Sequence, residues 1–363
     1  MDPRIREHAE IIVDHSVKVQ EGDEVILRGD PVAEELIIAV AELCGERGAN
    51  LNTRMNSSRA STAYRRALDI DDITMSDVSL AAMEEADVYI AIRADTNTNE
   101  TSDIDPEKTA AMSKANQEIL DIRLGKRWVG TQYPAAGNAQ DAEMSTPNYE
   151  EFVWDAVNKD WDAVREHQQQ MVEILDPAKE VRLVSGEETD VTMSVAGNHT
   201  INDYAERNLP GGEVFTAPVP DSVDGEVVFD KPLMAQGREI QDVYLNFEDG
   251  KVVDHGAEKN EEVLTAVLNT DDGARYLGEL GIGMNRDIDQ FTYNMLFDEK
   301  MGDTVHMALG RAYDGTVGEN NEQNQSAMHM DMIVDMSEES RIEVDGEVVQ
   351  RNGTFIFEDG FEA

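Results

Sequence analysis

The stretch Glu24-Val-Ile-Leu-Arg-Gly-Asp-Pro31 decides the fold of the N-terminal half. Its run Glu24-Val-Ile-Leu27 is short and mostly apolar, which is typical of a buried strand. Asp30 and Pro31 follow as a helix N-cap and a first-turn proline. We therefore expect a helix that ends near Arg47, just before Gly48.

The same strand-then-helix pattern continues along this half. The expected strands are Leu51–Met55, Asp87–Ile92 and Trp128–Gln132, and the expected helices are Ser58–Leu68, one that follows Asp105-Pro106, and a long amphipathic one at about Tyr149–Leu175. Strands that alternate with helices predict a parallel sheet with helices on its faces.

The sequence changes character near Val181, where short alternating strands begin. Three Asp-Gly pairs between β-branched runs are hairpin candidates: Val223-Asp-Gly-Glu226, Glu248-Asp-Gly-Lys251 and Val344-Asp-Gly-Glu347. We therefore predict an α/β N-terminal domain over residues 1–180 and a β-rich α+β domain over residues 181–363.

Acidic residues dominate the composition. Asp and Glu number 76 against 30 Lys and Arg, which gives a net charge of −46. Such a chain should repel nucleic acid and anionic membranes. Disorder is one explanation, but apolar runs extend almost from end to end and argue against it. We favour the solvated acidic shell of a folded halophilic protein.

Cysteine and hydropathy restrict the remaining possibilities. The single cysteine, Cys44, excludes intramolecular disulfides and cysteine-rich metal sites, and its apolar setting indicates a buried structural thiol. No apolar run approaches the ~20 residues of a membrane span. The N-terminal stretch lacks a signal-peptide core. We expect a cytoplasmic protein.

The pattern at His329 suggests metal chemistry. Phosphate-binding glycine loops, the Gly-x-Ser-x-Gly elbow and the His-Glu-x-x-His helix are absent from the sequence. In Ser326-Ala-Met-His-Met-Asp-Met-Ile-Val334, a strand would place His329 and Asp331 on one face and the neighbouring methionines on the other. The pair suits a divalent metal. The alternative is an ordinary His–Asp hydrogen bond on a half-exposed strand.

Other candidates are weaker when taken singly. His306 lies in an apolar segment, where an isolated histidine is usually a satisfied core residue. Glu213 and Glu279 stand out among 76 acidic residues because their surroundings are rich in glycine and uncharged. Composition and spacing alone indicate a metal-binding, β-rich domain.

Five segments, taken in order, resemble the aminopeptidase T and aminopeptidase S family of metallo-aminopeptidases. They are Asn208-Leu-Pro-Gly-Gly-Glu-Val-Phe-Thr-Ala-Pro218, Gly273-Ala-Arg-Tyr-Leu-Gly-Glu-Leu-Gly281, Leu296-Phe-Asp-Glu299, His306-Met-Ala-Leu-Gly-Arg-Ala-Tyr313 and Asn324-Gln-Ser-Ala-Met-His-Met-Asp-Met-Ile333. The resemblance is clearest in the C-terminal half. Two features differ from the family pattern: the stretch from Glu299 to His306 is longer, and the polar connection from Tyr313 to His329 is shorter.

The resemblance implies a site with two divalent metal ions. The ligands it implies are Glu213, Glu279, Glu299, His306, His329 and Asp331, and Tyr313 matches the active-site tyrosine. Ligands with nitrogen and oxygen but no sulfur allow zinc, cobalt, manganese or magnesium. Two such ions ~3.5–4 Å apart can share and activate a water.

In the reaction we expect, the shared hydroxide attacks the scissile carbonyl. One ion and the Tyr313 hydroxyl would stabilise the oxyanion, and Glu213 would carry the proton to the leaving amine. The function implied is release of N-terminal amino acids from short peptides by a homodimer whose active sites face an enclosed space. The alternatives are another metal-dependent amide hydrolase and a non-catalytic metal-binding protein.

The net charge generates a prediction about salt. At 0.01 M ionic strength the Debye length is ~30 Å, so acidic groups repel one another across the whole surface. We expect dialysis to low salt to cause unfolding or subunit dissociation, and molar KCl to reverse it. Circular dichroism melts and light scattering across a KCl series would measure this. A melting temperature that stays flat from millimolar to molar salt contradicts the halophilic interpretation.

Overall fold

The computed structural model describes residues 2–235 and 237–362, and the chain forms two compact units. One comprises Met1–Lys159 with Ala205–Gly211, and the other Asp160–Tyr204 with Gly212–Ala363. The first division therefore lies at 159/160, whereas the sequence placed it near residue 180. The difference arises because helix α9 (Trp161–Leu175) buries Met171 and Leu175 in the core of the second unit.

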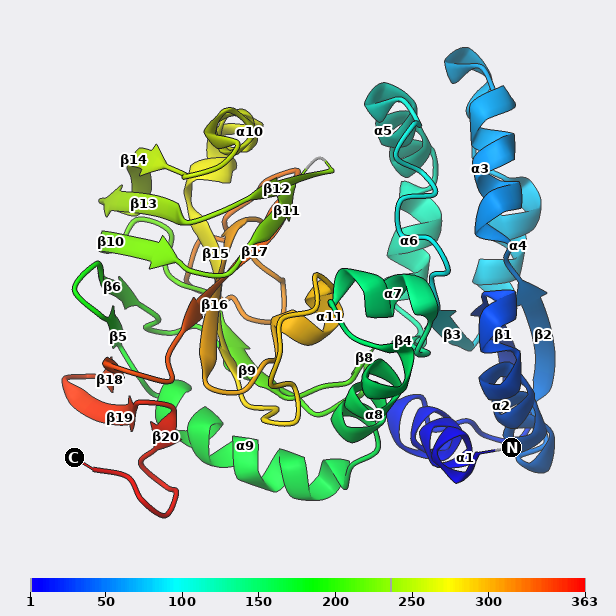
Figure 1. Cartoon of the computed structure of the whole chain (residues 1–363), viewed down its shortest axis with the longest axis horizontal. Coiled ribbons are helices and arrows are strands. Elements are labelled where there is room, and N and C mark those ends of the chain that lie inside the picture. Colours follow the sequence, from blue (N-terminus) through cyan, green and yellow to red (C-terminus); the bar gives the residue numbers. More distant parts are fainter. Residues whose placement is uncertain (1, 236, 363) are drawn as a thin grey trace. The chain divides into compact units, whose positions relative to one another are not determined.

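The first unit is built on a parallel sheet with the strand order β2-β1-β3-β4-β8 (Figure 1). The strands are β1 (Glu24–Gly29), β2 (Asn50–Met55), β3 (Val88–Arg93), β4 (Arg127–Gln132) and β8 (Asn208–Leu209). Its helices are α1 (Pro3–Glu10), α2 (Glu34–Glu46), α3 (Ser58–Ala67), α4 (Asp77–Glu85), α5 (Pro106–Ala115), α6 (Gln117–Leu124), α7 (Ala136–Asp141) and α8 (Thr146–Val157). The predicted α/β class is confirmed.

Helices cover both faces of this parallel sheet. On one face Ile26 of β1 packs with Met83 of α4, and Ile122 of α6 packs against the same cluster. On the other face Gly29 of β1 lies against Ile37 of α2. A strand buried on both faces must be apolar at consecutive positions, which is why Val25-Ile-Leu27 reads as an unbroken run.

The expected long helix at 149–175 is two helices. The α8 helix ends at Val157, and Asn158 leaves the helical conformation with ψ 81°. Asp160 then starts α9 afresh as its N-cap, accepting a hydrogen bond from the Ala163 amide. The apolar periodicity runs through the break, so it did not reveal the capping residue.

The second unit consists mainly of two antiparallel sheets. The eight-stranded sheet has the order β14-β13-β10-β6-β5-β18-β19-β20, and the five-stranded sheet the order β17-β16-β15-β9-β7. The strands are β5 (Glu180–Ser185), β6 (Thr189–Ser194), β7 (Ile201–Asp203), β9 (Glu213–Thr216), β10 (Asp224–Phe229), β13 (Val243–Glu248), β14 (Lys251–Gly256), β15 (Leu277–Gly283), β16 (Thr304–Gly310), β17 (His329–Asp335), β18 (Ser340–Val344), β19 (Glu347–Arg351) and β20 (Thr354–Phe355). A small hairpin, β11 (Leu233–Ala235) and β12 (Arg238–Ile240), and helices α10 (Glu261–Leu268) and α11 (Met295–Asp298) complete it.

The two sheets share one hydrophobic core. Val191 and Leu245 come from the eight-stranded sheet, and Leu280, Met307 and Met332 from the five-stranded sheet. On β17 the buried methionines alternate with His329 and Asp331, as the period-two pattern predicted. One face of the five-stranded sheet is thereby committed to the core, and its other face remains for polar side chains.

Two of the three Asp-Gly hairpin predictions are confirmed. Asp249-Gly250 joins β13 to β14, and Asp345-Gly346 joins β18 to β19, each with positive φ at both residues. The third prediction is wrong, because Gly225 lies inside strand β10. Its φ is +120°, and an added Cβ would overlap the Asp190 carbonyl of the neighbouring strand, so glycine is needed there for close approach.

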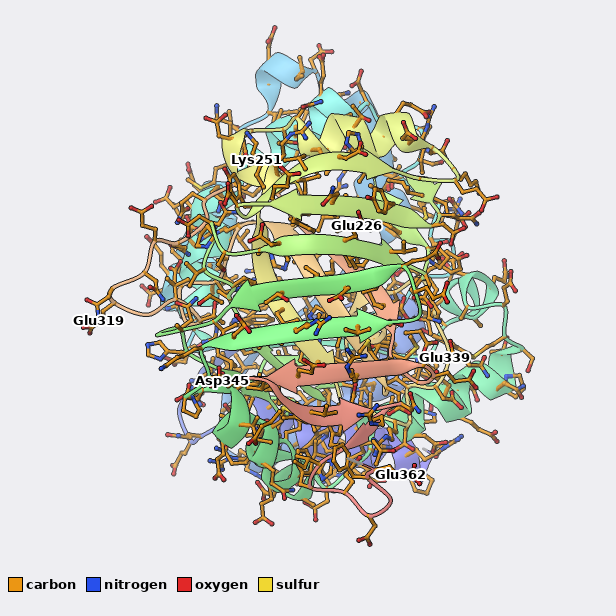
Figure 2. The ribbon with its side chains drawn as sticks, turned by 90° about the vertical axis from the view of Figure 1, so that its left-hand side faces the viewer. Glu226, Lys251, Glu319, Glu339, Asp345 and Glu362 are labelled. Carbon is orange, nitrogen blue, oxygen red and sulfur yellow. The ribbon has the colours of Figure 1, made fainter. Side chains whose placement is uncertain are left out.

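Charged side chains cover the outer face of the eight-stranded sheet. Figure 2 shows Glu226, Glu339 and Asp345 on this side of the molecule, and all three are exposed. Cross-strand pairs on the same sheet include Arg182 with Asp190 at 2.6 Å. Among the described residues, no helix combines the length and apolar content that crossing a bilayer requires.

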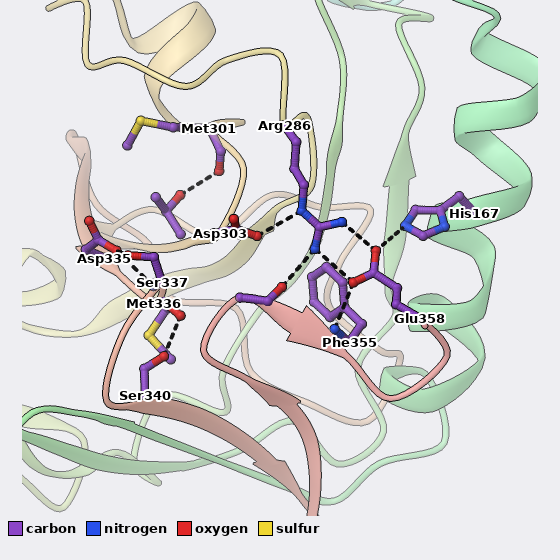
Figure 3. Close-up of polar contacts among 12 residues, drawn as sticks. His167, Arg286, Met301, Asp303, Asp335, Met336, Ser337, Ser340, Phe355 and Glu358 are labelled. Carbon is purple, nitrogen blue, oxygen red and sulfur yellow. Dashed lines mark hydrogen bonds and ion pairs between the residues drawn. The ribbon is translucent and has the colours of Figure 1, made fainter. Parts of the chain in front are cut away.

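Arg286 ties the C-terminal segment to the loop between β15 and β16 (Figure 3). Its guanidinium donates to Asp303 at 2.9 Å, to both carboxylate oxygens of Glu358 at 2.6 and 2.8 Å, and to the Gly353 carbonyl at 2.8 Å. His167 of α9 also meets Glu358, at 3.2 Å. Because this loop carries Glu299, the clamp helps to fix a predicted site residue.

Replacing Arg286 should therefore destabilise the second unit more than an ordinary surface change. We expect Arg286→Met to cost about 2 kcal/mol, the scale of losing hydrogen bonds to charged groups. Arg182→Met removes ion pairs with Asp190 and Glu343 within one sheet, without a tie to the C-terminal segment, and should cost less than about 1 kcal/mol. Denaturant unfolding of both variants in the same molar KCl measures the difference. Equal losses contradict the clamp.

Candidate metal centre

One face of the five-stranded sheet gathers charged side chains from every strand. Asp203 of β7 is opposite Glu213 of β9, and Glu213 is opposite Gly283 of β15. Glu279, Gly281 and Gly283 share a face of β15, and Gly281 is opposite His306 of β16. Strand β17 adds Asp331, opposite Ala308, and His329, opposite Gly310. Side-chain alternation on paired strands places all these residues on the same face.

These charged side chains form a row across the face of the sheet. Its centre is Glu279, which is buried and lies between two imidazoles. Its Oε1 is 3.1 Å from Nε2 of His306, and its Oε2 is 3.8 Å from Nε2 of His329. Glu213 approaches His306 from the other side, with Oε2 at 3.4 Å from Nε2. His306 is fully buried, so the sequence expectation of a satisfied core histidine gives way to an imidazole shared by two carboxylates.

Glycine at position 281 makes room for His306. A Cβ added there would overlap the imidazole ring, so the ring lies directly over the backbone of β15. The glycine-rich context of Leu277-Gly-Glu-Leu-Gly281, noticed in the sequence as an uncharged setting, thus has a steric cause.

His329 is oriented by a backbone contact. Its Nδ1 lies 2.8 Å from the Arg311 carbonyl and donates to it, which turns Nε2 toward the carboxylates on this face of the sheet. Nε2 points to Asp331 Oδ1 at 3.3 Å. Tyr313 is nearby, with its ring centroid 4.9 Å from that of His329. Histidine ligands of metals are commonly fixed in this way.

Glu299 is held by a different partner, Lys300. The Lys300 side chain is completely buried, and its ammonium contacts the Glu299 carboxylate, Glu213 Oε1 at 2.9 Å and Asp203 Oδ2 at 3.8 Å. Burial alone would lower the pKa of Lys300, but Glu213, Glu299 and Asp203 together keep that pKa well above its usual range. Lys300 is therefore an ammonium ion.

The electrostatics of the row favour added positive charge. Burial raises the pKa of Glu213 to about 8. Burial would lower the pKa of His306 and of His329, but the adjacent carboxylates outweigh it and raise these pKa values to about 10 and about 9. Protons collect here because buried carboxylates need compensation, and divalent ions would compete for the same positions.

The row fits divalent ions. Among the described residues two groups offer ligand atoms within 4.8 Å of one another: Glu213, Glu279 and His306, and then Glu279, His329 and Asp331. Glu279 belongs to both, and Glu299 to neither. Buried atoms without a hydrogen-bond partner include Glu213 Oε2, Glu279 Oε2, His306 Nδ1 and Asp331 Oδ1. Three of these are carboxylate oxygens suited to a metal ion.

Comparison with known proteins decides the family. The model of the thermophilic metalloprotease family, M29, matches residues 1–361. The chain belongs to the M29 metalloproteases. Aminopeptidase 2 of Geobacillus stearothermophilus and aminopeptidase AmpS of Bacillus subtilis are each 27 % identical to it over 98 % of both chains. Aminopeptidase T of Thermus aquaticus is 26 % identical over 93 % of both chains.

Solved structures agree on the fold. AmpT from Thermus thermophilus superposes with a TM-score of 0.86 at 23 % identity, covering 98 % of this chain and 99 % of that one. A 2,5-dihydroxypyridine dioxygenase from Pseudomonas putida shares the fold more distantly, at a TM-score of 0.63 and 15 % identity over 99 % of both chains. Since one fold occurs in a peptidase and a dioxygenase, the M29 assignment carries the reaction class.

Membership of M29 confirms the resemblance drawn from the five segments and makes the chain a metal-dependent peptide hydrolase. The sequence reasoning missed two members of the charged row, Asp203 and Lys300. Asp203 lies in Ile201-Asn-Asp203, where nothing marks one aspartate among many. Lys300 had a signal, since it directly follows a ligand candidate in a chain with few basic residues.

The position of Gly281 gives a test of this M29 site. Gly281→Ala should displace the His306 ring, so we expect the purified variant to lose most of its bound metal while remaining folded. Overpacking of this kind costs about 1–3 kcal/mol. Gly45→Ala is the matched control, because an added Cβ on helix α2 meets no atom within 4 Å. Elemental analysis of both variants decides; wild-type metal content in Gly281→Ala refutes the assigned role of His306.

Proposed function

We propose that this protein is an aminopeptidase that removes N-terminal amino acids from short peptides with the help of two divalent ions. The observation that carries the proposal is the sharing of Glu279 by two groups of ligand atoms. A carboxylate common to two groups is the arrangement a bridged pair of ions requires. The relatives named aminopeptidase support the substrate class.

In this proposal Glu213, Glu279 and His306 hold one ion, and Glu279, His329 and Asp331 hold the other. The donors are oxygen and nitrogen, without sulfur, which is compatible with zinc, cobalt, manganese or magnesium. When bound, the ions would activate a water and polarise the scissile carbonyl. We leave Glu299 out of the ligand set because its carboxylate contacts the Lys300 ammonium.

Tyr313 is the proposed donor to the oxyanion. Although 49 % of the residue is exposed, desolvation on its covered side and the surrounding acidic side chains raise the pKa of its phenol, so the hydroxyl keeps its proton and can donate. The Tyr313 ring packs against His329 and, at 6.2 Å between centroids, Phe215. These contacts hold the tyrosine beside the row.

Glu213 is the proposed proton carrier. Lys300 holds its Oε1, whereas its Oε2 is buried without a hydrogen-bond partner and faces the row. A carboxyl whose pKa burial raises to about 8 can both take and release a proton near neutral pH. A bound ion would lower this pKa and favour the ionised form of Glu213 that coordinates.

Two further parts of the proposal rest on the sequence. The acidic composition supports function at high salt, and the family resemblance supports a homodimer. Sedimentation in molar KCl would measure the assembly state directly.

The test of the function is whether a free α-amino group is required. A free amine can bind an ion or donate to a ligand carboxylate, and an acetylated amine can do neither. Losing a charge-assisted contact costs about 1.5–3 kcal/mol, and unpaired buried charge adds to it. We expect acetylation of a good tripeptide to lower kcat/KM at least roughly a hundredfold, about 2.7 kcal/mol.

The control for this experiment is the C-amidated form of the same tripeptide, which should be cleaved almost as well as the free peptide. Paired kinetics on the three forms give the answer. Equal cleavage of free and acetylated peptides, or cuts at internal bonds, would replace the aminopeptidase with a general metal-dependent amide hydrolase. Binding of metal without turnover of any peptide would indicate a non-catalytic protein.

A further inference from the structure

We infer that Lys300 is a built-in cation of this centre: its ammonium holds Asp203, Glu213 and Glu299 together, withdraws Glu299 from the metal ligands and orients Glu213 toward His306. The inference deepens the proposed function and rests on it, because it concerns the ligands of the same two ions. It makes Lys300 a positioning residue that acts through Glu213.

The geometry fixes the ammonium. Lys300 is the second residue after the short helix α11, where its amide donates to the Phe297 carbonyl and its carbonyl accepts from the Asn285 amide. Its side chain is fully buried, so water cannot solvate the charge. A buried ammonium persists only where acceptors surround it. Glu213 of strand β9 and Glu299 at the end of α11 lie close enough to accept from it, and Asp203 of strand β7 adds a longer ion pair at 3.8 Å.

Glu213 joins the lysine to the metal ligands. Its two oxygens are divided, with Oε1 at 2.9 Å from Lys300 Nζ and Oε2 at 3.4 Å from His306 Nε2. With one oxygen tied, the carboxylate presents the other to the ion shared with Glu279. The main chain holds the same residue in place, since the Glu213 carbonyl accepts from Gln168 at 3.0 Å.

Glu299 has the opposite arrangement. Its partner is the lysine next to it in the chain, and no ligand atom of Glu299 joins either group of candidate ligands among residues 2–235 and 237–362. Five side chains, rather than six, are left to hold the ions.

The first experiment tests whether Glu299 is a metal ligand. Metal-free full-length protein in molar KCl is titrated with Mn²⁺ by calorimetry, and bound metal is counted by elemental analysis. We expect Glu299→Gln to keep two ions per chain and a Kd within about threefold of wild type. Glu279→Gln, the matched control, should weaken binding at least about tenfold, the scale of lost ligand support. A loss in Glu299→Gln as large as that in Glu279→Gln overturns the inference.

The second experiment tests the lysine itself by its coupling to Glu299 in metal-free protein. Lys300→Met keeps the length of the side chain and removes the charge, so we expect a lower melting temperature than wild type. Adding Glu299→Gln to it removes one uncompensated carboxylate and should raise the melting temperature again. A lysine with only a packing role would give additive losses, and that result refutes the inference.

The inference can still be tested if Lys300→Met does not fold. If Lys300→Met yields no folded protein, the Mn²⁺ titration of Glu299→Gln, which retains Lys300, decides alone. The proposed function fails separately: wild type that binds Mn²⁺ but cleaves no peptide refutes the aminopeptidase and leaves the Lys300 result standing. Wild type that binds no divalent ion refutes the metal centre, and the metal-free coupling still reports on Lys300.

Discussion

Buried carboxylates need positive charge, and this requirement shapes the second unit. The five-stranded sheet commits one face to the hydrophobic core, so its acidic and imidazole side chains must share the other. Glu213, Glu279 and His306 are almost entirely removed from water there. Buried charges are stable only when paired or bound to ions. Gly281 on the same face leaves room for the His306 ring.

The raised pKa values of His306 and His329 follow from the same constraint. Without metal, the adjacent carboxylates stabilise the protonated form of both imidazoles. This effect outweighs burial, which would lower the two pKa values. Divalent ions would replace those protons and return both imidazoles to the neutral form that coordinates. Occupancy by metal and occupancy by protons are therefore alternatives at one site.

Most of this arrangement could be predicted from the sequence, because the strand period and the alternation of strands with helices are local patterns. The alternation of His329 and Asp331 with buried methionines needs only the strand period, and it is confirmed. The alternation of strands and helices in the first unit follows from local strand and helix signals. Two predictions failed or differed for nonlocal reasons: Gly225 is a close-approach glycine, and α9 packs with the second unit. A third differed for a local reason, because Asp160 is an N-cap within a continuous apolar periodicity.

Asp203 could not be found in this way, and the only local signal for Lys300 was its place beside a ligand candidate, because the role of both residues depends on segments distant in sequence. Asp203 reaches the row only because β7 pairs with β9, and Lys300 only because α11 lies beside it. Asp203, Glu213, Glu279, Glu299 and Asp331, when ionised, are five carboxylates, and the two divalent ions that we propose would, with one ammonium, supply five positive charges to match them. Removing the lysine would leave the metal-loaded site with an uncompensated buried carboxylate, which is a physical reason for a lysine at position 300.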